Sequence, residues 1–244
     1  MAKPRIYVDL PLNEGEKILL PEAQAHHLVQ VLRLRIGEDL TIFNGQDGEF
    51  EAVLTSASKR EVLAWLVRHH AVARESSLQI TLGQCVSKGD RMDYTLQKAV
   101  ELGVAHIVPL LSERSVVKLD AERWEKKMEH WRGVIVSSCE QSGRTRIPVL
   151  EPVINIQHWL PKTSSESLKL TLAPGATQKL NQIERADRPI TLLVGPEGGL
   201  SDAEIERSRK AGFEALSLGP RILRTETAGV AALAVLQSQW GDLD

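Results

Sequence analysis

From about residue 78 onward, short apolar runs alternate with amphipathic stretches, and this pattern constrains the fold more than any other feature of the chain. The runs "LQITLGQCV" and "ITLLV" are typical of strands buried on both faces, whereas "RMDYTLQKAV" repeats its apolar residues at helical spacing. Asp90 is the expected N-cap of that helix, and Gly103 is expected to end it. Strands alternating with helices predict an α/β fold with an open, mostly parallel sheet.

The first part of the chain has a different pattern. Short β-branched or alternating runs are separated by turn residues such as "NGQDG", which predicts a small β-rich domain over residues 1–73. One helix is expected within it, with Ala25, Leu28, Val31 and Leu32 on its apolar face. The polar stretch "VARESS" has the composition of a linker, so residues 74–244 are predicted to form the second domain.

Composition excludes several classes of protein. A chain of 244 residues with 42% hydrophobic residues can bury a core, and a net charge of −2 argues against indiscriminate binding of nucleic acid, although not against a local basic cleft. Two cysteines are too few for a disulfide framework. The N-terminus lacks the apolar segment of a signal peptide, and no apolar run approaches the roughly 20 residues that span a bilayer. We therefore expect a soluble, cytoplasmic protein that does not enter a membrane.

Three glycine- or proline-containing turns follow predicted strands: "TLAPGA", "LLVGPEGGLS" and "LSLGPRILRTET". In an open parallel sheet, ligands bind outside the carboxyl ends of the strands, where these turns are expected to lie. The second turn precedes a helix with a capping box, Ser201 and Glu204, so free N–H groups adjoin its glycines. It matches neither a Walker loop nor the dinucleotide fingerprint. Taken alone it could be a simple strand-to-helix turn, but three such turns at one edge favour a ligand site.

The third turn concentrates charge at the start of the last helix. Arg221 and Arg224 precede Glu226, which is expected in the first helical turn, with Thr225 or Thr227 as the cap. Two interpretations remain open at this level, a binding site or a plain ion pair between Arg224 and Glu226.

A second basic group, Arg144 and Arg146 in "CEQSGRTRIP", suits phosphate contacts but equally suits the carboxyl end of a helix. The pairs His26–His27 and His69–His70 lack further ligands at metal-binding spacing, so no metal is predicted. There is also no Gly-x-Ser-x-Gly elbow of a hydrolase.

Six segments in order resemble the bacterial ribosomal RNA small-subunit methyltransferase E family, of the SPOUT class. They are "HHLVQVLRLRIGED", "KGDRMDYTLQKAVELGV", "LLSERSVVK", "CEQSGRTRIP", "LLVGPEGGLSDAEIE" and "LGPRILRTETA". The resemblance covers nearly the whole chain. It implies a PUA-like β-barrel followed by an α/β domain with a C-terminal trefoil knot. It also implies S-adenosylmethionine-dependent methylation of N3 of a uridine in the decoding region of 16S rRNA, within the small ribosomal subunit.

The resemblance implies roles for individual residues as well. The cofactor pocket would comprise Leu172, Gly195, Glu197, Gly198, Leu218, Gly219, Ile222 and Leu223. The catalytic residues would be Arg224 and Glu226, with Arg144. RNA would be held by Arg5, Arg33, Arg35, Arg144, Arg146 and Arg221. Two positions depart from the family pattern, Ala173 where a histidine is frequent and Ser142 where some relatives carry cysteine.

The implied chemistry needs alignment of the attacking nitrogen and a way to stabilise the uridinate, because N3 is not nucleophilic while protonated. Arg224 is expected to stabilise the developing negative charge, and Glu226 to position that arginine or accept the proton. A homodimer formed through the last helix is implied, with Arg144 acting across the interface. Two alternatives stay open, another RNA target with the same chemistry and a non-catalytic RNA-binding or assembly factor that retains the cofactor pocket.

Overall fold

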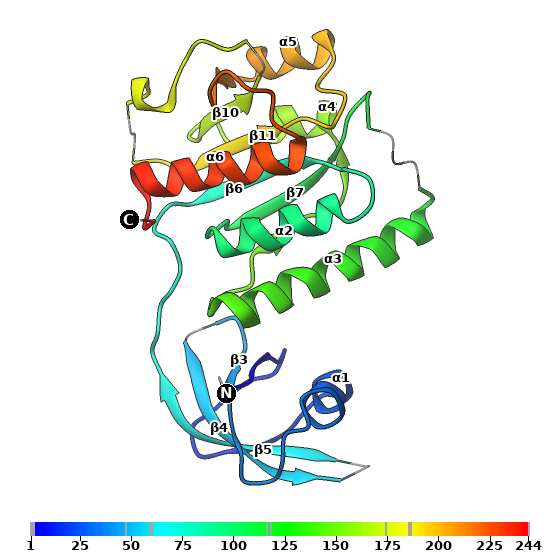
Figure 1. The fold of residues 1–244 in the computed structure, drawn as a ribbon, viewed down its shortest axis with the longest axis vertical. Helices are drawn as coiled ribbons and strands as arrows, with labels where there is room; N and C mark the ends of the chain where they lie inside the picture. Colours follow the sequence, from blue (N-terminus) through cyan, green and yellow to red (C-terminus); the bar gives the residue numbers. More distant parts are fainter. Residues whose placement is uncertain are drawn as a thin grey trace. The chain divides into compact units, whose positions relative to one another are not determined.

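The computed structural model describes residues 3–46, 48–58, 61–115, 117, 119–173, 175–184 and 187–243. Contacts divide the chain into two compact units (Figure 1). The first comprises Met1–Glu75 together with Cys139–Ile147, and the second Ser76–Ser138 together with Pro148–Asp244. The segment 139–147 therefore belongs to the first unit, whereas the sequence pattern grouped it with the second domain.

The first unit contains a five-stranded sheet in the order β1-β3-β4-β5-β2. Its strands are β1 (Arg5–Tyr7), β2 (Lys17–Leu19), β3 (Asp39–Phe43), β4 (Glu49–Ala57) and β5 (Val62–His70). The pairing is antiparallel except between β1 and β3. Alternate residues of β4 are buried, as a strand with one face on a core requires. That core includes Leu28, Leu40 and Leu54.

The helix expected in this unit is shorter than predicted and changes type. An α-helix, α1 (Glu22–His26), continues as a π-helix, η1 (His27–Val31), in which Leu32 N–H donates to His27 O over 2.9 Å. The wider turn shifts the apolar positions around the axis. As a result Leu28 is buried, whereas Val31 and Leu32 are 58% and 45% exposed. The predicted apolar face was therefore wrong beyond Leu28.

The second unit contains a seven-stranded sheet in the order β12-β10-β11-β6-β7-β8, with β9 also pairing with β7. Its strands are β6 (Ile80–Cys85), β7 (His106–Leu111), β8 (Val149–Leu150), β9 (Ile154–Asn155), β10 (Leu168–Leu172), β11 (Ile190–Val194) and β12 (Glu214–Leu216). Neighbouring strands pair in parallel, and every residue of β11 is buried. The predicted open parallel sheet is confirmed.

Helices cover this sheet. They are α2 (Arg91–Glu101), α3 (Ala121–Ser142, whose last turn lies in the first unit), α4 (Ile156–Trp159), α5 (Asp202–Lys210) and α6 (Thr225–Trp240), with short 3₁₀ turns η2 (Leu160–Lys162) and η3 (Leu180–Gln182). Helices α2 and α6 pack against each other (Figure 1). Successive residues of a strand point to opposite faces. Gly83 thus lies under Trp159 of α4, while the neighbouring Gln84 faces Gly229 of α6.

The helix ends agree only in part with the predicted caps. The capping box of α5 is present, because Ser201 Oγ accepts from Glu204 N–H and Glu204 Oε2 accepts from Ser201 N–H at 3.3 and 2.9 Å. Asp90 precedes α2, but its side chain makes no capping bond. Thr225 is the first residue of α6 rather than its cap, since Arg224 occupies the N-cap position. Within the described residues, no helix combines the length and the apolar character needed to cross a bilayer.

Candidate active site

The strand order brings the predicted site segments to one edge of the second unit's sheet. Strands β12, β10 and β11 are adjacent and parallel, so the loop beginning at residue 173, loop 195–201 and loop 217–224 all leave at the carboxyl edge. Strand β6 pairs with β11 on its other side. From β6 the chain passes to β7, and from β11 it passes in the opposite direction to β12. The carboxyl ends of β6 and β11 therefore form a topological switch point, where ligands of such sheets bind.

Loop 195–201 is held at both ends. Thr225 Oγ donates to the carbonyl of Gly195 over 2.6 Å and accepts from the buried Gln84 amide over 3.0 Å. At the other end, Arg114 donates to the carbonyl of Gly198 over 2.9 Å, and a Cβ on Gly198 would lie 3.4 Å from the Arg114 side chain. Thr225 therefore does not cap α6 as predicted. Its hydroxyl instead links β6, the start of α6 and this loop.

Two carboxylates from different elements meet one arginine at the switch point. Glu197 Oε1 accepts from Arg91 Nη1 over 3.1 Å and from Lys88 N–H over 3.2 Å. Glu226 Oε1 lies 3.8 Å from Arg91 Nε. The structure therefore brings Glu197 and Glu226, both predicted site residues, to the same guanidinium, that of Arg91, which the prediction did not include.

Three buried polar atoms in this region have no hydrogen-bond partner among the described residues. They are Gln84 Oε1, Ser87 Oγ and Glu226 Oε2. Buried polar groups are nearly always partnered, so each such atom calls for an explanation. Acceptors at the carboxyl edge of a parallel sheet are suited to N–H or O–H groups of a bound ligand.

Loop 217–224 leaves apolar and basic side chains exposed. Gly219 has φ of +100°, a conformation that glycine adopts without strain. Ile222 is 86% exposed, and Arg221 and Arg224 are exposed beside it. An apolar residue this exposed, flanked by cations, is a suitable surface for a planar base and a phosphate.

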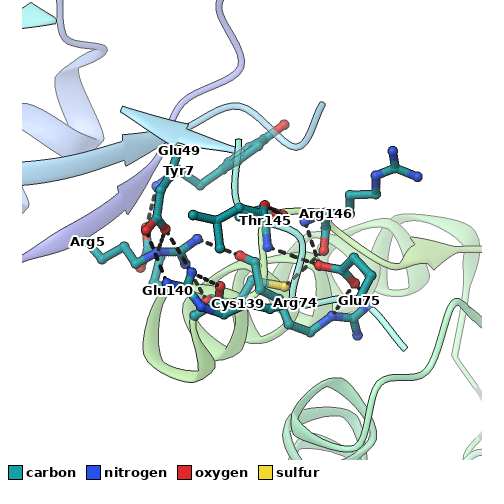
Figure 2. A network of polar contacts seen from close by, with 12 residues as sticks. Arg5, Tyr7, Glu49, Arg74, Glu75, Cys139, Glu140, Thr145 and Arg146 are labelled. Carbon is teal, nitrogen blue, oxygen red and sulfur yellow. Dashed lines mark hydrogen bonds and ion pairs between the residues drawn. The ribbon is translucent and has the colours of Figure 1, made fainter. Parts of the chain in front are cut away.

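The first unit contains a separate network of polar contacts, drawn in Figure 2. The Arg5 guanidinium donates to the carbonyls of Cys139 and Arg144 at 2.7 and 2.8 Å and to Glu49 at 3.0 Å. It also stacks on Phe43, with 3.9 Å between its central carbon and the ring centroid. Arg5 therefore binds the last turn of α3 and the segment after it.

Glu75 binds the same segment from the other side. Its carboxylate accepts from Arg144 Nε at 2.8 Å, from Thr145 N–H at 3.0 Å and from Arg146 N–H at 3.1 Å (Figure 2). The Arg144 side chain is 8% exposed and that of Glu75 19%. Arg144 is thus occupied within the protein, and a catalytic or RNA-binding role would require this ion pair to break.

Burial and charge shift several pKa values in the network. Burial pushes the pKa of Glu49 upward, but the hydrogen bonds from Arg74 and Arg5 outweigh it and hold that pKa below its ordinary value. Burial raises the pKa of Glu140, which accepts from Tyr7 N–H over 2.9 Å. Burial also raises the pKa of the Cys139 thiol to about 12.

The six arginines predicted to contact RNA fall into two groups. Arg5 and Arg144 are engaged in the network just described, whereas the other four are exposed: Arg33, Arg35, Arg146 and Arg221. Arg33 has φ of +57°, which is uncommon for a residue with a side chain and is often found at functional sites. The side chains of these four arginines reach the protein surface, where the prediction expects contacts with an RNA backbone.

A hollow in the second unit lies away from the predicted site, and the described residues offer no metal site. This hollow, of about 790 Å³, is lined mainly by α3 and by residues 150–153, and none of the predicted residues lines it. In the part of the chain that the structure describes, no cluster of three or more His, Cys, Asp or Glu side chains could hold a metal ion.

Several residues of these sites carry no distinct signal in the sequence. Gln84 lies inside a strand, and Glu75 lies in a stretch with the composition of a linker. Arg91 and Arg114 occur within the segments "KGDRMDYTLQKAVELGV" and "LLSERSVVK", which carried the family resemblance, and that was the one signal that could have found them.

Comparison with known proteins shows the family of this chain. Residues 74–237 match the model of an RNA methyltransferase domain, and residues 20–64 match that of an RNA methyltransferase PUA domain. The ribosomal RNA small subunit methyltransferase E of Buchnera aphidicola (subsp. Schizaphis graminum) is 37% identical over 240 residues, covering 98% of each chain. The chain belongs to the ribosomal RNA small subunit methyltransferase E family.

Other members of the family extend the comparison. The Bacillus subtilis enzyme is 31% identical, with 96% of each chain covered. The crystal structure of the Neisseria gonorrhoeae enzyme, bound to S-adenosyl methionine, has 42% identity and a TM-score of 0.95 over 99% of this chain and 100% of that one. A chain from Legionella pneumophila with the cofactor SAM bound has 42% identity and a TM-score of 0.96, with both chains covered completely.

Proposed function

We propose that this member of the family transfers a methyl group from S-adenosylmethionine to N3 of one uridine in the decoding region of 16S rRNA. The observation that carries the proposal is the similarity over nearly the full length of both chains to relatives named for the small-subunit RNA, one of which has a structure with the cofactor bound. The similar Legionella pneumophila chain also has SAM bound. The unpartnered acceptors and exposed loops of the carboxyl edge support the proposal.

The residues at this edge fit the cofactor. Three loops leave the sheet at its carboxyl edge, on β11 and on the two strands beyond it, and the exposed Ile222 offers an apolar surface for an adenine. We assign cofactor binding to the predicted set: Leu172, Gly195, Glu197, Gly198, Leu218, Gly219, Ile222 and Leu223. When bound, S-adenosylmethionine supplies an electrophilic methyl group on a sulfonium. The tethers of loop 195–201 by Thr225 and Arg114 would keep the loop ordered before binding and so lower the entropy cost.

Glu226 and Arg224 are proposed to activate the uridine. Glu226 Oε2 is buried and has no partner among the described residues, so it can accept the N3 proton. Arg224 is exposed at the N-cap of α6, next to Glu226 in sequence. Its guanidinium would stabilise the negative charge that develops on the uracil oxygens. Because Arg144 is ion-paired with Glu75, we assign it a structural role and give the RNA backbone contacts to the exposed arginines.

The finer architecture follows from the same family membership. We propose that the first unit closes as a PUA-like barrel, that the loops of the second unit form the trefoil knot of SPOUT enzymes, and that α6 pairs with its copy in a homodimer. Val235 on α6 is 39% exposed, which is compatible with such an interface. The substrate would be the small ribosomal subunit in the cytoplasm.

The test is transfer of labelled methyl onto small subunits that lack the modification, followed by mapping of the labelled nucleotide. Glu226→Gln should lower kcat by about 10²–10⁴-fold, and Arg224→Ala by about 10²–10³-fold. Glu206→Gln and Arg209→Ala are matched controls, because these two residues form an exposed pair with each other on α5. Label on another RNA would favour a different target, and cofactor binding without label would favour an assembly factor. Wild-type turnover in either active-site variant would remove its assigned role.

A further inference from the structure

Arg91 is located where the helix alone would disfavour it. It is the first residue of α2, and the positive end of a helix dipole favours acidic rather than basic side chains. Asp93, in the same first turn, is directed instead to His130 and Trp131, with which it makes hydrogen bonds of 2.6 and 3.1 Å. The position of Arg91 therefore requires another reason.

That reason is in the contacts that Arg91 makes. Its Nη1 donates to Glu197 over 3.1 Å, and its Nε lies 3.8 Å from Glu226. Glu197 follows β11, Glu226 lies in the first turn of α6, and Arg91 starts α2, so one guanidinium joins three segments that are distant in sequence. A planar guanidinium has five donors in a fixed arrangement and can serve two carboxylates, which a lysine ammonium does less well.

The two oxygens of Glu226 are in different situations. Oε1 faces Arg91, while Oε2 is buried and unpartnered among the described residues. The Glu226 side chain is 14% exposed, against 43% for Arg91. A cation on one oxygen fixes the direction of the other, and the neighbouring Thr225 is held by Gln84 and Gly195. The first turn of α6 is thereby positioned on both sides.

We propose that Arg91 is a positioning residue, which holds Glu226 through Oε1 so that the carboxylate keeps a fixed orientation for proton transfer, and which ties this carboxylate to loop 195–201 through Glu197. The inference rests on the proposed role of Glu226. Arg91 touches neither the methyl group nor the base, and it acts through the two carboxylates. Loss of its side chain should therefore misplace the proton acceptor, and small displacements of a reacting group cost large factors in rate.

The test is a double-mutant cycle of Arg91→Gln and Glu226→Gln, with methyl transfer followed under enzyme excess so that slow variants remain measurable. Alone, Arg91→Gln should lower the transfer rate by about 10–100-fold. In the Glu226→Gln background, Arg91→Gln should lower the transfer rate by less than about twofold, because the effects of substituting residues that act as one unit are not additive. Arg91→Lys should recover part of the loss, since an ammonium keeps the charge but lacks the planar, spaced donors of a guanidinium.

Lys98→Gln is the matched control. Lys98 lies two turns further along α2 and pairs with Glu101 at 2.8 Å, so its removal takes the same charge from the same helix. It should leave the rate unchanged in both backgrounds. If Arg91→Gln lowers the rate by the same factor with and without Glu226, or does not lower it at all, the inference is overturned while the proposed role of Glu226 stands. Wild-type turnover in Glu226→Gln alone would instead overturn that role, and the inference with it.

Discussion

The contacts of Glu75 predict that a single carboxylate stabilises the first unit. It accepts hydrogen bonds from the Arg144 guanidinium and from the backbone N–H groups of Thr145 and Arg146, in a setting where both side chains are largely buried. Breaking a buried pair by removing one partner costs about 3–5 kcal/mol. For a chain of this size that unfolds as a whole, each kcal/mol lowers Tm by about 2–4 °C, so Glu75→Ala should lower the Tm of the protein by about 6–20 °C.

Differential scanning calorimetry measures the shift, and hydrogen exchange of segment 139–147 shows where it originates. Glu51→Gln is the control in the same unit, because Glu51 pairs with Lys3 and His70 at the surface and its loss should leave Tm nearly unchanged. The Tm of the double variant Glu75→Leu, Arg144→Met should fall less than that of Glu75→Ala, because replacing both partners leaves no unpaired charge on Arg144 in the interior. A Tm for Glu75→Ala within about 2 °C of wild type would refute the reasoning.

Two further predictions follow from burial. Burial raises the pKa of Cys85 and of Cys139 to about 12, so at pH 8 only about one thiol in 10⁴ is ionised, and a thiol reagent should label neither cysteine until denaturant is added. Rapid labelling of the native protein would contradict this. Gly83→Ala would put a Cβ about 2.4 Å from the Trp159 ring and should destabilise the protein by about 1–3 kcal/mol in urea unfolding. Gly133→Ala, in the exposed middle of α3 with nothing within 4 Å, should instead stabilise it by about 0.5–1 kcal/mol, and equal effects of the two changes would count against the packing argument.

Sequence periodicity was sufficient for the parts of the fold that depend on local pattern. The buried run of β11 and the capping box at Ser201 are features of neighbouring residues, and both are present as predicted. The π-helical turn after His26 was not predicted, because its change from i→i+4 to i→i+5 hydrogen bonds leaves no distinct pattern of residue types in the sequence. Helical spacing therefore placed Val31 on the wrong face.

The candidate site could be outlined from the sequence as a set of segments but not as a set of contacts. Glycine-rich turns after strands indicated the carboxyl edge, yet the strand order that places β6 beside β11 depends on pairing between residues far apart in the chain. For that reason Arg91 could not be joined to Glu226 from the sequence. The role of Glu75 was hidden for the same reason, since its partners begin 69 residues later.

The return of segment 139–147 to the first unit has a consequence for biosynthesis. N-terminal domains usually fold first as the chain emerges from the ribosome. Here the carbonyls that Arg5 binds, and the groups that Glu75 binds, belong to residues 139–146 and do not exist when residue 75 has just been made. At about 5–20 residues per second, roughly 4–14 s separate the synthesis of Glu75 from that of Ile147. The strands of the first unit thus await a segment that is translated only after residues 76–138 of the second unit, and the order of folding departs from the order of translation.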